Sequence, residues 1–203
     1  MSKLRVLKES DAYTFRSYFE MNAEPEDIIA DLGYALLTER LILPKTMIKL
    51  DWEADLQAKL ERLLSVVSLT SETARRETLV APILFEVAIH CQAQLRIEYP
   101  LVVNNWLKGN LDYLLRSSQN MVIIEAKKDD LTRGFTQLVA EMIALAQSRE
   151  LTHLYGAVTI GDAWRFGYLD VPNQCVKQDI KLFTVPDDLM DLLQVLIGIL
   201  ELK

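Results

Sequence analysis

The chain has 203 residues, of which half are hydrophobic and a quarter are charged, and its net charge is −7. This composition predicts a globular protein with a substantial core, built as one domain or as a core with an extension. The acidic charge argues against nucleic-acid binding, because DNA-binding proteins usually carry a basic face. It does not exclude such binding, because acidic and basic residues are close to balance over residues 71–150.

Residues 1–68 predict an α-helical N-terminal extension that packs on the rest of the chain. Aromatic residues recur over residues 11–21, and Pro25 followed by two acidic residues is typical of a helix start. Apolar residues at helical spacing follow Pro25 as far as Leu36, and a second amphipathic helix is predicted over residues 51–67. Between them, residues 41–44 predict a short extended piece.

Residues 69–203 predict an α/β core that forms one structural domain with the extension. Ser71 or the residue before it caps a helix running to about residue 92, which Pro82 should kink or split. Pro100, within a predicted strand, indicates a sheet edge or a bulge. The further predicted elements are strands over residues 96–103, 110–116, 121–127, 153–160 and 163–168, and helices over residues 131–148 and 186–202. The last helix is apolar nearly all round, so it must be buried in its own chain or against a second copy.

The hairpin formed by the second and third of these strands carries the candidate site. Its turn over residues 117–120 sets a register in which Asp112 faces Glu125, and Lys127 shares their face. Two carboxylates about 5 Å apart at their Cβ atoms repel each other unless a positive group lies between them. A divalent metal ion would satisfy them, and a surface salt bridge at a strand end is the alternative. The opposite face is expected to be wholly apolar, with Leu111, Tyr113, Leu115, Val122, Ile124 and Ala126.

The same residues resemble a known motif. Asp112, followed by Glu125-Ala126-Lys127 at the end of an apolar strand, resembles the core motif of the PD-(D/E)XK nucleases, the restriction-endonuclease-like superfamily. The stretch Gly109-x-x-Asp112-Tyr113 is similar to a frequent form of the first half of that motif, although its proline is replaced here.

The resemblance extends over roughly residues 70–170, and the whole chain resembles a bacterial branch of the superfamily. It implies a restriction-endonuclease-like α/β core. Such a core is a mixed sheet of about four to five strands flanked by helices, to which this chain adds the N-terminal extension and the C-terminal helix.

The resemblance also implies roles for the motif residues. In that family the Asp and the Glu bind Mg²⁺, so Asp112 and Glu125 would be the metal ligands, with Mn²⁺ as a substitute ion. Lys127 would position or activate the attacking water. The backbone carbonyl of Ala126 would add a further ligand.

Other residues are secondary candidates. An early glutamate of the first core helix often completes the metal site in this family, which implies Glu72, with Glu77 as the alternative. Lys128 points to the other side of its strand, toward solvent or phosphate. Some branches position substrate with Gln-x-x-x-Tyr in the helix after the motif; Gln137 matches the glutamine, but Glu141 stands at the tyrosine position. A solvated helix face is the preferred explanation of Gln137 and Glu141, and substrate contact by Gln137 is the alternative.

These features predict Mg²⁺-dependent hydrolysis of phosphodiester bonds in nucleic acid, with DNA as the favoured substrate. The alternative is a catalytically idle protein of the same fold that acts as a binding or regulatory module. The acidic charge favours that alternative, and the intact Asp, Glu-x-Lys set opposes it. A homodimer is expected, because cutting two strands needs two sites and the C-terminal helix or the N-terminal aromatic helix would supply the interface.

The sequence also predicts a cytoplasmic protein with no membrane partner. It contains no apolar run of roughly 18 residues that could span a bilayer, and residues 1–6 lack the apolar core of a signal peptide. Cys91 and Cys175 are far apart and in no metal-ligand spacing, so both are expected to be reduced.

Overall fold

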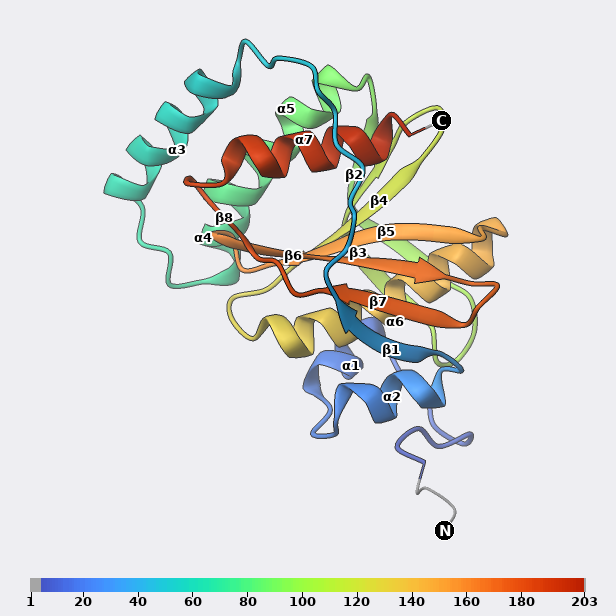
Figure 1. Ribbon diagram of the computed structural model, residues 1–203. Coiled ribbons are helices and arrows are strands. Elements are labelled where there is room, and N and C mark those ends of the chain that lie inside the picture. Colours follow the sequence, from blue (N-terminus) through green and yellow to red (C-terminus); the bar gives the residue numbers. More distant parts are fainter. Residues whose placement is uncertain (1–4, 203) are drawn as a thin grey trace.

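The computed structural model describes residues 5–202 and shows an open mixed sheet of eight strands with helices on both faces (Figure 1). The predicted α/β class with a mixed sheet is therefore confirmed. Residues 1–4, part of the N-terminal segment used to predict the compartment, lie outside the described residues. Within residues 5–202, no helix combines the length and the apolar character needed to cross a bilayer.

Helices and strands are interspersed along the chain. The helices are α1 (Phe15–Glu20), α2 (Pro25–Asp31), α3 (Glu53–Val66), α4 (Glu72–Arg75), the π-helical segment η1 (Arg76–Val80), α5 (Ala81–His90), α6 (Leu131–Arg149) and α7 (Leu189–Leu200). The strands are β1 (Ala35–Glu39), β2 (Gln94–Val102), β3 (Lys108–Arg116), β4 (Met121–Ala126), β5 (His153–Thr159), β6 (Ala163–Asp170), β7 (Cys175–Asp179) and β8 (Phe183–Thr184). Their order in the sheet is β1-β7-β6-β5-β4-β3-β2, with β8 beside β6. The β1–β7 and β4–β5 pairs are parallel, and the other pairs are antiparallel.

The sheet is larger than the expected four to five strands, because β1, β7 and β8 were not predicted. The helix starting at Pro25 was expected to continue to Leu36. Instead, α2 ends before Gly33, whose φ of +89° belongs to the left-handed region, and the chain turns directly into β1. β7 has the mixed sequence Cys-Val-Lys-Gln-Asp, which gives no clear alternation of apolar and polar residues. The predicted extension thus contributes a strand to the sheet as well as helices.

The hairpin of β3 and β4 has the predicted register, with Tyr113 opposite Ile124 and Arg116 opposite Met121. The ladder ends at Tyr113, immediately before Asp112 and Glu125 would pair. Beyond this point a side chain replaces the backbone as the hydrogen-bond acceptor. The Asp112 Oδ2 accepts a hydrogen bond from the backbone N–H of Ala126 at 2.9 Å.

The apolar faces of the hairpin differ from the prediction at one residue. Tyr113, Leu115, Val122, Ile124 and Ala126 belong to one core layer, as expected. Leu111 belongs to the layer on the other face of the sheet. This change accompanies an interruption of the β2–β3 ladder at Glu98, whose φ is +52°. Pro100 lies on β2, at the edge of the sheet, as predicted.

The helix predicted over residues 71–92 is present as α4, η1 and α5 in succession. Pro82 does not break it, because Pro82 lies in the first turn of α5, where a missing N–H costs little. The irregularity precedes the proline and takes the form of the wider π-helical turn of η1. Arg76, the first residue of η1, reaches β3, where it contacts Asp112 and the hydroxyl of Tyr113.

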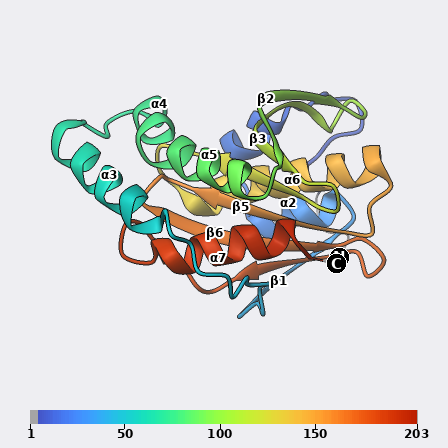
Figure 2. The ribbon, with the colours of Figure 1, turned by 90° about the horizontal axis from the view of Figure 1, so that it is seen from above.

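Two apolar layers enclose the sheet. α3, α5 and α7 cover one face, and α1, α2 and α6 cover the other (Figures 1 and 2). α7 is buried in its own chain and packs so closely on the segment near Lys45 that a Cβ on Gly198 would lie 2.7 Å from the Lys45 Cα. In α1, Phe15 and Tyr18 are buried as well. The apolar surfaces that suggested a homodimer are therefore buried within one chain. The homodimer stays a prediction, and these two helices do not supply its interface.

Candidate active site

A cavity of about 430 Å³ lies where α1, η1, β3, β4 and α6 meet. Asp112, Glu125 and Lys127 all line it, so the fold brings the three residues of the sequence motif together. The other lining residues with functional groups or rings include Phe15, Arg16, Phe19, Glu72, Arg76, Glu98 and Gln137.

Glu125 lies at the base of the cavity with an exposed fraction of 0%. Its Oε1 forms an ion pair with Lys127 Nζ and accepts a hydrogen bond from Gln137 Nε2 at 2.7 Å. A carboxylate at this depth would be costly without such partners. The side chain is therefore held in one orientation by its surroundings.

Lys127 directly follows β4. Its backbone N–H donates a hydrogen bond to the Thr159 carbonyl at 2.8 Å, which ties the residue to β5. Its side chain passes over Gly134 of α6, where an added Cβ would lie 3.1 Å from Lys127 Cγ. The ring centroid of Phe19 is 5.0 Å from Lys127 Nζ. Gly134 thus leaves the space that lets the lysine reach Glu125.

Asp112 lies on β3 with a side chain that is 13% exposed. In addition to the hydrogen bond from Ala126, its Oδ1 lies 3.3 Å from Arg76 Nη1. The same Arg76 nitrogen lies 2.7 Å from Glu98 Oε1 on β2. One guanidinium therefore bridges two carboxylates at the wall of the cavity.

Burial and mutual repulsion govern the charges in this site. Burial raises the pKa of Glu125, and the nearby Asp112 carboxylate raises it further. Burial also raises the pKa of Asp112, although Arg76 and the Ala126 N–H oppose the rise. Burial lowers the pKa of Lys127, but attraction to Glu125, Asp112 and Glu141 together outweighs this effect, so the net shift is upward. The three carboxylates of Glu98, Asp112 and Glu125 thus face two cations, Arg76 and Lys127. This excess of negative charge favours the binding of a further cation.

The prediction of a solvated helix face at Gln137 and Glu141 is wrong. Their exposed fractions are 4% and 0%, because both side chains lie on the side of α6 that faces Glu125 of β4. Gln137 Nε2 donates to Glu141 Oε1 at 2.9 Å as well as to Glu125. Burial and the proximity of Glu125 raise the pKa of Glu141 well above its usual range. Burial beside Glu125 therefore favours the protonated form of Glu141.

The remaining candidates divide between the cavity and the surface. Glu72 lines the cavity from the first turn of α4, whereas Glu77 is exposed and lies outside the lining. Lys128 is also exposed and lies outside the lining. The side chain of Ala126 is buried in the core, and a role for its carbonyl oxygen as a ligand stays a prediction.

Four residues at the site were missed in the sequence. Arg76 and Glu98 come from elements distant in the chain, and nothing in their local pattern indicated that they would meet Asp112. Arg16 and Phe19 belong to the aromatic segment of residues 11–21, which the sequence predicted to be core or dimer contact. The charge of Arg16 within this aromatic segment was the available sign that the segment reaches the site, and it is a weak sign.

The donor set fits a hard divalent cation. Asp112 and Glu125 supply carboxylate oxygens to one cavity, and Glu72 and Glu98 lie on its wall. Within residues 5–202, no three side chains of His, Cys, Asp or Glu are grouped closely enough to hold a metal ion on their own. Mg²⁺ usually keeps several waters and binds through one or two carboxylates together with substrate phosphates. A site with two carboxylates therefore suits this ion better than one that needs a complete protein cage.

Comparison of the chain with protein-family models and with curated proteins gave no match. The interpretation of the site consequently rests on its own geometry and chemistry.

Proposed function

We propose that this protein hydrolyses phosphodiester bonds in nucleic acid with the help of Mg²⁺ or Mn²⁺, and that DNA is its favoured substrate. The observation that carries the proposal is the buried pair of Glu125 and Lys127 at the base of a cavity that Asp112 also lines. Acids and an ammonium are rarely buried together without a functional or structural reason. A restriction-endonuclease-like core is part of the same proposal.

Each residue has a distinct role in this proposal. Asp112 and Glu125 would hold the ion, with Glu72 as an additional ligand. A bound divalent ion polarises the phosphate and lowers the pKa of a coordinated water. The Lys127 ammonium orients the attacking water and offsets the charge that develops on the phosphate oxygens. Gln137 keeps the Glu125 carboxylate in place through its 2.7 Å hydrogen bond.

Calorimetric titration with Mn²⁺ and a cleavage assay on labelled DNA test this proposal. Asp112→Asn and Glu125→Gln should weaken Mn²⁺ binding, and Lys127→Ala should retain binding but lose cleavage. Asp191→Asn is the matched control, because Asp191 also lies between two cations but is on the surface, outside the cavity. Equal Mn²⁺ affinity in the wild type and both acid variants would show that the carboxylates are structural and would remove the basis of the proposal.

A binding module without catalysis is the second candidate. Two observations favour a binding module. Arg76 already pairs with both Asp112 and Glu98, and the net charge of the chain is −7. If the protein is a binding module, Asp112 should not bind Mn²⁺ and the protein should not cleave DNA. The Arg76→Ala substitution should then change only the folding stability. The calorimetric titration distinguishes the two, because only the hydrolase needs both carboxylates for the ion.

A cytoplasmic location is proposed with the same function. Cys91 and Cys175 are both free thiols, and Cys175 is buried. Unpaired cysteines suit a reducing compartment. Fractionation of cells that produce the protein, with detection by antibody, tests the location.

A further inference from the structure

The site lies deep in the molecule. Glu125 is 0% exposed and Lys127 is 9% exposed, and both are reached through the cavity of about 430 Å³. Binding pockets for small ligands have volumes of roughly 300–1,000 Å³. A space of this size accepts a nucleotide or a short unpaired segment of a strand.

The helix α1 forms one wall of this cavity and is firmly seated. Phe15 packs on Gly109 of β3, where an added Cβ would lie 2.8 Å from Phe15 Cδ2, and φ of +147° at Gly109 also favours glycine. The Tyr18 hydroxyl donates a hydrogen bond to the Trp106 carbonyl at 2.7 Å. These contacts fix α1 against the strand that carries Asp112. Helix α1 therefore limits the width of a ligand that can enter the cavity.

Phe19 and Arg16 are the groups that α1 presents to the cavity. The Phe19 side chain is half-buried, and its ring lies over the Lys127 ammonium with the centroid 5.0 Å from Nζ. An aromatic ring beside a phosphate-binding cation is suited to stack on a base that has left its helix.

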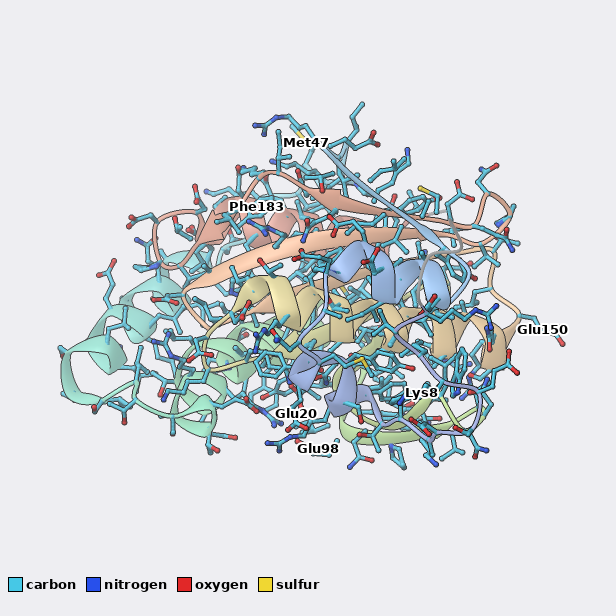
Figure 3. All side chains as sticks on the ribbon, turned by 90° about the horizontal axis from the view of Figure 1, so that it is seen from below. Lys8, Glu20, Met47, Glu98, Glu150 and Phe183 are labelled. Atoms are coloured by element: carbon cyan, nitrogen blue, oxygen red, sulfur yellow. The ribbon has the colours of Figure 1, made fainter. Side chains whose placement is uncertain are left out.

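Arg16 is 80% exposed and pairs with Glu20 at 2.7 Å, and the Glu72 carboxylate on the opposite wall raises its pKa after the larger effect of Glu20. Figure 3 shows Glu20 of α1 and Glu98 of β2 on the same side of the molecule. An exposed ion pair contributes little stability, so Arg16 can exchange Glu20 for a phosphate at small cost.

We propose that the substrate class of this site is single-stranded nucleic acid, an unpaired end or segment, and that intact duplex is excluded. This inference rests on the proposed hydrolase function. A duplex is stiff over about 150 base pairs and cannot bend one phosphate past α1 to a buried lysine. A duplex also needs an extended basic surface, and a net charge of −7 opposes such a surface. An unpaired strand needs only local phosphate contacts and a stacking ring, and Arg16, Lys127 and Phe19 supply them.

The test measures binding and cleavage separately. Fluorescence anisotropy in EDTA gives the affinity for a labelled single-stranded DNA, for the same sequence in RNA, and for the blunt DNA duplex. Phe19→Leu keeps apolar volume but removes the ring, and it should weaken single-strand binding roughly tenfold, as expected for one stacked base. Arg16→Gln should weaken it as well. Arg5→Gln is the matched control, because Arg5 forms an equally exposed i,i+4 pair with Glu9.

The outcomes separate this inference from the proposed function. Tighter binding of the single strand than of the duplex, together with losses in Phe19→Leu and Arg16→Gln but not in Arg5→Gln, supports the inference. Such binding without any metal-dependent cleavage would overturn the hydrolase and show that the cavity binds single strands without hydrolysing them. Equal binding or equal cleavage of the duplex would overturn the inference alone. Thermal denaturation shows whether Phe19→Leu is folded, and the exposed Arg16→Gln gives the answer if it is not.

Discussion

Replacing Glu141 with glutamine should make the metal-free protein less sensitive to rising pH. Glu141 is 0% exposed, and its Oε1 accepts a hydrogen bond from Gln137 at 2.9 Å. Glutamine has nearly the same shape, keeps an oxygen for this bond, and offers an N–H to Glu125. The Glu141→Gln variant therefore keeps the hydrogen-bond network but no longer needs a proton to complete it.

The sign and the size of the effect follow from proton binding. Burial raises the pKa of Glu141 in the folded chain, whereas an unfolded Glu has a pKa of about 4.3. Above that value the folded chain holds a proton that the unfolded chain has lost, so the free energy of unfolding falls as pH rises. The fall is about 1.4 kcal/mol per pH unit for one proton, until the pH reaches the folded pKa. Between about pH 6 and pH 8 the wild type should therefore lose more stability than Glu141→Gln, by up to roughly 3 kcal/mol.

Urea denaturation in EDTA at several pH values measures this difference. Glu61→Gln is the control, because Gln57 Nε2 donates to Glu61 Oε1 at 3.0 Å in the same i,i+4 arrangement, but on the exposed face of α3. Its stability should follow the wild type at each pH. The Glu125–Glu141 pair is intact in the wild type and in the control, so a difference confined to Glu141→Gln reports on this pair. If Glu141→Gln lost as much stability as the wild type over this pH range, the protonation of Glu141 in the folded chain would be refuted.

Three further predictions concern the surroundings of the site. Arg76→Ala removes the partner of Asp112 and should lower the free energy of unfolding by about 1.5–3 kcal/mol. Mn²⁺ should restore part of this loss in thermal denaturation, and no restoration would contradict a cation site there. Gly134→Val adds atoms where a Cβ already lies 2.8 Å from Val158 Cγ2, so it should cost about 1–3 kcal/mol and reduce DNA cleavage more than Mn²⁺ binding. Leu196→Ala, in the buried α7, should cost about 2–5 kcal/mol without changing the sedimentation coefficient, whereas dissociation of a dimer would show that α7 is an interface.

The local features of the hairpin were predictable because they depend on short-range geometry. The alternation of side chains and the polar turn set the pairing of Tyr113 with Ile124, and this pairing put Asp112, Glu125 and Lys127 at one cavity. The edge position of Pro100 follows from its missing N–H in the same direct way. Each of these conclusions uses neighbours within one or two elements. The bridging of Asp112 and Glu98 by Arg76 does not, because it depends on where a distant helix meets two strands.

The burial of Glu141 shows where a helical period stops being informative. Spacing of 3.6 residues identifies the apolar face of α6 that meets the sheet, but it cannot show that Gln137 and Glu141 also turn toward the sheet, where Glu125 lies. A buried acid is costly without a partner, and Gln137, which donates to both carboxyl groups, offsets part of that cost. The N-terminal segment is more than an accessory to the core. Its helix α1 packs on α6 and lines the cavity, and Phe19 of α1 lies over Lys127 and narrows the approach to the site.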